Sequence, residues 1–231
     1  MSRTWEVLGA VGAAYTVGPQ LAASALGLAA VRSVPQARGV VALTFDDGPR
    51  AGSTERVLEL LAGHGSQATF FMVGERVVAH PGLARNVAEA RHAVGNHTQH
   101  HRHLWTAGPL ATWREVAAAS EAIEAATGTA PRLFRPPWGL LNLASLAACR
   151  KLGMVSVLWS VRAEGFFWQP GPEEMAAHVL AEVREGAIVD LHDAGPGGTE
   201  PTAVLAALPL ILRGLDRLGL RSVSLPALLG L

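Results

Sequence analysis

Residues 40–49 read VVALTFDDGP, a short apolar run that ends in two adjacent carboxylates and a Gly-Pro turn. An apolar run bounded by turn residues is typical of a buried strand that enters a loop. From Arg38 onward, runs of this kind alternate with helix-like segments about seven times. Alternation with short connections predicts a parallel sheet with helices outside it. We therefore expect an α/β fold.

The polar residues of interest follow the C-terminal ends of the expected strands, where β/α barrels place their sites. A closed or nearly closed barrel is therefore favoured over an open doubly wound sheet, although open sheets also bind ligands at that edge. The expected strands are 40–45, 68–73, 93–97, 132–135, 154–161, 187–192 and 221–224. The expected helices are 53–62, 83–92, 110–127, 142–152, 172–184 and 203–218.

Composition limits the class of protein. The chain has 231 residues, 49% of them apolar, which fits one good-sized domain with at most a short appendage. Lys+Arg and Asp+Glu both number 19, and no basic stripe indicates nucleic-acid binding. The single cysteine, Cys149, provides no disulfide framework and lies in an apolar helical pattern, so we expect it in the core.

The N-terminal segment is apolar. Residues 7–31 contain no charged side chain, and Arg32 and Arg38 follow them. This length suffices to cross a bilayer as a helix, so we expect a membrane anchor. A cleaved secretory signal, with small residues at 23–25 and 28–30, and an apolar helix packed on the domain are the alternatives. We place the apolar segment at residues 1–38 and the main domain at 39–231.

The first candidate site residues are Asp46, Asp47, His97 and His101. One Asp and two His form a plausible three-ligand set for a divalent metal with an open position for water. The second Asp is then free to handle the proton of that water. The spacing of the two histidines predicts that both imidazoles lie on one face of a helical turn. The alternatives are a solvated turn and a polar loop with incidental histidines.

The run Arg135-Pro136-Pro137-Trp138-Gly139 follows the fourth expected strand. Arginine keeps its charge, so it can hold a nearby carboxylate ionised and oriented. The two prolines stiffen the loop, and Trp138 offers a flat wall suited to a sugar ring. A rigid surface turn is the alternative.

The sixth expected strand ends with His192. A histidine at a strand end can act as a general acid, with Asp193 or Asp190 orienting the ring. A histidine at the edge of the core is the alternative. Taken together, the polar strand ends indicate a metal-assisted hydrolase.

The sequence resembles the polysaccharide deacetylase family, also called the NodB-homology domain or carbohydrate esterase family 4. The motif Thr-Phe-Asp-Asp-Gly-Pro stands at 44–49, and a His-Thr-x-x-His motif at 97–101. An Arg-Pro-Pro-aromatic-Gly motif occupies 135–139, and a late motif ending in histidine occupies 189–192. The resemblance covers nearly all of residues 40–225.

The resemblance implies a distorted (β/α)7 barrel, here preceded by an apolar N-terminal helix, and a role for each matching residue. Asp47, His97 and His101 would bind a divalent metal, most often Zn²⁺, with Co²⁺, Ni²⁺ or Mn²⁺ as alternatives. Asp46 would deprotonate the water on the metal, and His192 would protonate the leaving amine. The remaining roles are the tethering of Asp46 by Arg135, an oxyanion contact from the backbone N–H of Trp138, and a substrate-binding wall formed by Pro137, Trp138, Leu191 and Trp159.

One segment departs from the family pattern. The family usually has an acidic segment that ends in Asp-Trp after the fifth strand, and an aspartate there supports the arginine. Here Arg162 and Gly165 stand at the expected acidic positions. We consider that Glu164 replaces the missing partner of Arg135 and that Trp168 replaces the groove tryptophan.

The implied function is the metal-dependent removal of N-acetyl groups from a glycan that contains N-acetylglucosamine, with release of acetate. A glycan-binding homologue with impaired catalysis and an O-acetyl esterase are the alternatives. With the apolar residues 7–31, we expect association with the membrane or export, with the domain outside the cytoplasm and an envelope glycan as substrate. The sequence does not define the oligomeric state.

Overall fold

The structure of the chain is a computed structural model that describes residues 2–24, 29–165 and 168–231. Its strands are β1 (Val40–Asp46), β2 (Ala68–Met72), β3 (Ala93–Asn96), β4 (Leu133–Phe134), β5 (Val155–Ser156), β6 (Val161–Arg162), β7 (Ile188–His192) and β8 (Arg221–Ser222). Its α-helices are α1 (Ser2–Ser24), α2 (Ser53–Gly63), α3 (Gly74–Ala79), α4 (Pro81–Glu89), α5 (Pro109–Thr127), α6 (Leu143–Leu152), α7 (Pro172–Glu182), α8 (Thr202–Arg217) and α9 (Leu225–Leu229). Short 3₁₀ turns are η1 (Leu104–Thr106), η2 (Pro137–Gly139) and η3 (Pro196–Gly198).

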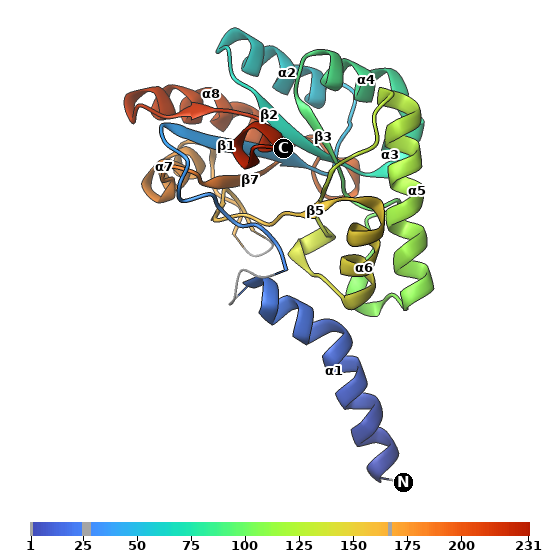
Figure 1. The fold of residues 1–231 in the computed structure, drawn as a ribbon. Coiled ribbons are helices and arrows are strands. Elements are labelled where there is room, and N and C mark those ends of the chain that lie inside the picture. The colour runs from blue at the N-terminus through green and yellow to red at the C-terminus, as the bar shows by residue number, and fades with distance from the viewer. Residues whose placement is uncertain (1, 25–28, 166–167) are drawn as a thin grey trace.

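The strands form one parallel sheet in the order β5-β4-β3-β2-β1-β7-β6, and β8 pairs with the beginning of β1. Figure 1 shows the helices around the outside of these strands. Residues 31–34 lie between β5 and β7, because Val31 bridges Val157, directly after β5, and Ser33 bridges Ala187, directly before β7. The arrangement confirms the expected distorted (β/α)7 barrel.

Alternation of side chains along the strands separates two layers. Leu43 and Phe45 of β1 and Leu191 of β7 belong to the core cluster between the sheet and the helices. Ala42 and Ile188 point to the other face and pack inside the barrel. The same alternation places four polar residues on the interior face of these two strands, namely Thr44, Asp46, Asp190 and His192.

The expected strand at 154–161 is two strands, β5 and β6, separated by residues 157–160. The apolar run is continuous in sequence, but its middle pairs with Val31 and Ile188 rather than continuing one ladder. Helix α3 was not expected, because six residues are too few to show a helical period. Cys149 is buried, as expected.

The N-terminal helix α1 extends away from the body of the domain in Figure 1, and its C-terminal half contacts it. The Tyr15 hydroxyl donates to the carbonyl of Ala107, and the Gln20 side chain accepts from the amide of Leu141 at 2.9 Å. Within the described residues, we find no helix with the length and apolar character needed to cross a bilayer. The signal-like positions 23–25 and 28–30 lie partly outside the described residues.

Candidate metal centre and proton-transfer site

The strand register brings the sequence motifs to one edge of the sheet. Asp46 at the end of β1 pairs with His192 at the end of β7 and with Phe71 of β2. Asn96 at the end of β3 pairs with Phe134 of β4. Because all these strands are parallel, the loops that follow them meet at the same end of the barrel.

Asp47, His97 and His101 come together as predicted, and their ligand atoms form one compact group. Asp47 Oδ1 lies 3.4 Å from His97 Nε2 and 3.0 Å from His101 Nε2. This oxygen is buried and makes no hydrogen bond of acceptable geometry within the described chain. An unpaired buried carboxylate oxygen facing two imidazole nitrogens fits a divalent cation, since burial without a partner is costly.

The charges of this group also fit a cation. Burial alone would raise the pKa of Asp47, but its close contacts with His101 and His97 lower that pKa far below the usual range. Burial opposes protonation of His97, yet the neighbouring Asp46 and Asp47 carboxylates raise its pKa. With Nδ1 of His97 donating to the backbone, its Nε2 and Asp47 Oδ1 face each other favourably when a positive charge, either a proton or a metal ion, lies between them.

His97 is oriented for ligation by a neighbouring backbone group. Its Nδ1 lies 2.7 Å from the carbonyl oxygen of Arg135, so Nδ1 carries the hydrogen and Nε2 is left as the ligand atom. The predicted helical turn is wrong: residues 97–101 form a loop in which Thr98 (φ 68°) and His101 (φ 52°) are left-handed. The loop, rather than a helical period, aims both imidazoles at Asp47.

Two buried side chains that belong to none of the predicted site residues hold this loop. The Asn96 side chain accepts from the amide of Thr98 and donates to the carbonyl of Val116 on α5. Glu115 accepts from the backbone and side-chain nitrogens of His100, which therefore points away from the cation group. A buried glutamate within an otherwise apolar helix face is the sequence signal that would have indicated such a role.

Asp193 supports the Asp-Asp-Gly-Pro turn instead of orienting His192. Its side chain accepts from the Thr54 hydroxyl, and its carboxylate packs so closely on Gly48 that a Cβ there would lie 2.1 Å from Oδ2. The turn therefore requires glycine at position 48. Burial raises the pKa of Asp193 to about 7 against the opposing hydrogen bond from Thr54.

Arg135 is fully buried inside the barrel and binds Asp46 as predicted. Its Nη1 lies 2.7 Å from Asp46 Oδ1 and 2.7 Å from the hydroxyl oxygen of Thr44. Its guanidinium also stacks over the ring of Phe71, 4.2 Å from the centroid. This arrangement fixes one oxygen of Asp46, while the other, Oδ2, lies 3.8 Å from His97 Nε2.

The second carboxylate on Arg135 is Asp190, not Glu164. Asp190 Oδ1 lies 3.2 Å from Arg135 Nη1, and Asp190 Oδ2 lies 3.5 Å from Arg162 Nε. The expectation that Glu164 replaces the partner of Arg135 is wrong, because the Glu164 carboxylate binds His192 instead. Asp190 is a charged residue within the apolar strand IVDLH, and such a residue needs a buried partner. This sequence feature indicates that Asp190 binds a buried cation.

Glu164 binds His192, the role that we had assigned to Asp193 or Asp190. Glu164 Oε1 lies 3.0 Å from His192 Nδ1, so the ring donates from Nδ1, and this contact leaves Nε2 for another partner. Burial opposes protonation of His192, but Glu164, Asp190 and the Asp46–Asp47 pair outweigh it and raise the pKa of His192 to about 10. His192 is thus held as an imidazolium.

The expected aromatic wall is only partly formed. Trp138 is exposed and lies against His101, with ring centroids 4.5 Å apart, and Pro137 before it is buried. Trp159 lies under Arg162 at 4.3 Å. The expectation for Leu191 is wrong: it is fully buried against the helices, on the opposite face of β7 from Asp190 and His192. Trp168 packs on His178, while residues 166 and 167 of the altered segment lie outside the described residues.

The fold and the site define a parallel β/α barrel with three candidate metal ligands beside an arginine-bound carboxylate and an imidazolium. The chain belongs to the polysaccharide deacetylase family, whose model matches residues 33–157. This membership confirms the resemblance drawn from the sequence motifs.

Two curated relatives illustrate the family. A peptidoglycan-N-acetylglucosamine deacetylase of Bacillus cereus is 36% identical over 197 residues, which cover 85% of this chain and 91% of the relative. A chitooligosaccharide deacetylase of Bradyrhizobium sp. is 39% identical over 197 residues, which cover 81% and 90%. The curated relatives therefore include deacetylases named for peptidoglycan and for chitooligosaccharides.

Two solved structures show the same fold. A peptidoglycan N-acetylglucosamine deacetylase in complex with 4-naphthalen-1-yl-N-oxidanyl-benzamide is 30% identical, with a TM-score of 0.80 over 87% of this chain and 92% of that one. A pseudoenzyme of the same esterase family from Bacillus anthracis is 26% identical, with a TM-score of 0.78 over 87% of this chain and 69% of that one. Family membership alone therefore does not establish activity.

Proposed function

We propose that this protein is a metal-dependent N-deacetylase that releases acetate from N-acetylglucosamine units of a glycan. The observation that carries the proposal is the position of Asp46, which Arg135 holds by one oxygen beside the group formed by Asp47, His97 and His101. The activity of the curated relatives on peptidoglycan and chitooligosaccharides supports the reaction class.

Asp47, His97 and His101 would hold the metal, most often Zn²⁺ in this family. When bound, such an ion polarises the acetamide carbonyl and makes water a stronger acid. Asp46 accepts the proton of the attacking water through Oδ2, because Oδ1 is already bound to Arg135. The backbone N–H of Trp138 donates to the oxyanion that develops on the carbonyl oxygen when the water attacks the carbonyl carbon.

His192 supplies the proton that the leaving amine needs. Glu164 holds the ring through Nδ1, so the Nε2–H is the group that donates the proton to the amine. The raised pKa of about 10 keeps His192 protonated near neutral pH. Collapse of the tetrahedral intermediate transfers this proton to the nitrogen, breaks the C–N bond and releases acetate.

The test is acetate release from chitotetraose and from peptidoglycan by the full chain, with added zinc and with a chelator. We expect release that the chelator abolishes and zinc restores. The Asp46→Asn variant should keep the metal and lose about 10²–10⁴-fold in kcat, since a positioned general base contributes this much.

The alternatives predict different results. Glycan binding with a full complement of metal and no acetate from either substrate would favour a protein that has lost catalysis, as the solved pseudoenzyme allows. Retained turnover in Asp46→Asn would contradict the assignment of Asp46 as the base. Release of acetate from O-acetylated but not N-acetylated glycan would make the protein an esterase.

A further inference from the structure

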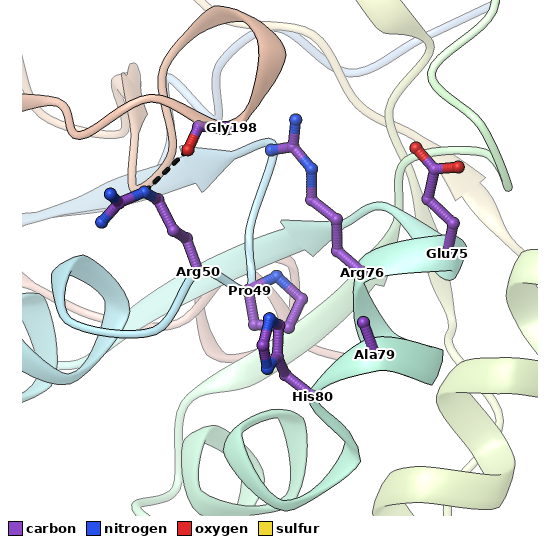
Figure 2. Close-up of a pocket in the computed structure, with 7 residues that line it drawn as sticks. All are labelled: Pro49, Arg50, Glu75, Arg76, Ala79, His80 and Gly198. Carbon is purple, nitrogen blue, oxygen red and sulfur yellow. Dashed lines mark hydrogen bonds between the residues drawn. The ribbon is translucent and has the colours of Figure 1, made fainter.

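A cavity of about 380 Å³ lies beside the Asp-Asp-Gly-Pro turn, outside the proposed metal and proton-transfer residues. Figure 2 shows Arg50, which follows the turn, and Arg76 from α3 lining this cavity with their guanidinium groups on either side of Gly198. The remaining lining residues are Pro49, Glu75, Ala79 and His80. The lining thus carries two guanidinium groups, one carboxylate from Glu75 and a partly apolar floor.

The two arginines are fixed by backbone carbonyls rather than by carboxylates. Arg50 Nε donates to the carbonyl of Gly198 at 2.7 Å, and its Nη1 donates to the carbonyl of Ala51. Arg76 Nη1 donates to the carbonyl of Asp47. In the part of the chain that the structure describes, neither Arg50 nor Arg76 forms an ion pair. No paired carboxylate therefore neutralises either guanidinium, and each has an Nη2 group that can donate to a ligand.

The placement of Gly198 brings the two charges to one opening. Gly198 has φ 81°, and a Cβ atom on it would lie 3.8 Å from Arg76 Nη2. The same residue accepts from Arg50, so both guanidinium groups border one point of the η3 turn. Two preoriented arginines at one opening suit a carboxylate or a phosphate, whose paired oxygens match the guanidinium fork.

The cavity lies next to the proposed metal centre. Arg76 binds the backbone of Asp47, one of the proposed ligands, and Pro49 of the lining follows Asp47 by two residues. A ligand in the cavity is therefore a neighbour of a sugar bound at the metal centre. We propose that Arg50 and Arg76 form an anion subsite that binds a carboxylate or phosphate substituent on the glycan, next to the sugar that is deacetylated.

This inference rests on the proposed function for its substrate, so its test is a binding measurement independent of turnover. The dissociation constant is measured by calorimetry for a tetrasaccharide of alternating N-acetylglucosamine and N-acetylmuramic acid, and for the methyl ester of its carboxylates. A second pair is chitotetraose and its 6-phosphorylated form. The full chain carries zinc and the Asp46→Asn substitution, so that no substrate is consumed.

We expect the anionic member of at least one pair to bind about tenfold more tightly, which corresponds to about 1.4 kcal/mol. The pair that shows this difference identifies carboxylate or phosphate as the natural group. Arg50→Gln should remove most of the difference. The matched control is Arg56→Gln on α2, which alters an exposed arginine paired with Glu59 and should leave the difference unchanged.

Equal affinity for charged and neutral members of both pairs would overturn the anion subsite. The same holds if Arg50→Gln and Arg56→Gln reduce the difference equally, because a general effect of surface charge would then explain it. Acetate release by the protein with Asp46 intact is scored separately. Charge-dependent binding without acetate release would contradict the proposed function and leave the subsite standing.

Discussion

The two halves of the site are built in different ways. The ligand half, Asp47, His97 and His101, rests on two short sequence motifs and on local supports such as the carbonyl of Arg135. The proton half consists of Asp46, Arg135, Asp190, Glu164 and His192, which come from four different segments of the chain, with Asp190 and His192 both on β7. The ligand half thus depends on loop conformation, whereas the proton half depends on pairing between buried charges.

The comparison shows how a barrel keeps its charges balanced when a supporting segment changes. Arg162 occupies a position where the family usually has an acidic residue, and Asp190, its register partner on β7, provides a carboxylate instead. Asp190 on β7 also contacts Arg135. The guanidinium therefore binds two carboxylates, those of Asp46 and Asp190. A buried charge is costly without a partner, and the Asp190 carboxylate meets this need for Arg135 and also contacts Arg162.

The largest effect is expected in the ligand half. Asp47→Ala removes the oxygen that faces both imidazoles, so zinc should no longer bind stoichiometrically. Acetate release should fall by about 10³-fold or more, since the ion supplies several kcal/mol of stabilisation to the transition state. Metal content and kcat measured on the same samples check this. Full zinc occupancy in Asp47→Ala would place the metal elsewhere.

A smaller effect is expected when the proton half is altered at Asp190. Asp190→Asn removes one carboxylate from Arg135 but leaves Asp46, so we expect kcat to fall about tenfold with zinc affinity unchanged. Adding Arg162→Asp restores a carboxylate on the paired strand position and should recover most of the loss. Asp216→Asn, an exposed site beside His64, is the matched control. A full kcat in Asp190→Asn would show that Asp46 alone holds Arg135.

The smallest effect concerns the pH profile. Glu164 stabilises the imidazolium of His192, so Glu164→Gln should lower the pKa of His192. The general acid must be protonated, and activity is therefore lost as the pH rises through this pKa. The alkaline limb of kcat should move toward lower pH by about one unit, in line with the loss of one nearby charge.

The control for this experiment is Glu174→Gln, which changes an exposed glutamate on α7. Its pH profile should coincide with that of the unmodified protein. An unchanged alkaline limb in Glu164→Gln would show that His192 does not limit turnover as the acid.

The sequence predicts the ligand half better than the proton half for a physical reason. Asp47, His97 and His101 follow strand ends, and parallel strands place their ends at one edge whatever the loops do. The partners of Arg135 and His192 depend instead on which buried carboxylate reaches which cation across β6 and β7. Glu164 and Asp190 are both near in space, and only the side-chain geometry distinguishes them.

The strands, like the site, are predicted only in part by the sequence. Long apolar runs such as β1 and β7 were found with bounds close to those observed. The break between β5 and β6 was missed, because residues 154–161 are apolar enough to read as one strand while residue 31 pairs into the gap. Pairing with a distant segment leaves no local signal in the sequence.

The most direct test of the division into two halves is anomalous diffraction at the zinc edge from crystals grown with zinc. Among the residues that the structure describes, two groups offer metal-ligand atoms: Asp47, His97 and His101, and a second group of Asp46, Asp190 and His192. We predict one anomalous peak bounded by Asp47 and the Nε2 atoms of His97 and His101. A peak bounded by Asp46, Asp190 and His192 would contradict the account, because the residues assigned to proton transfer would then be the ligands.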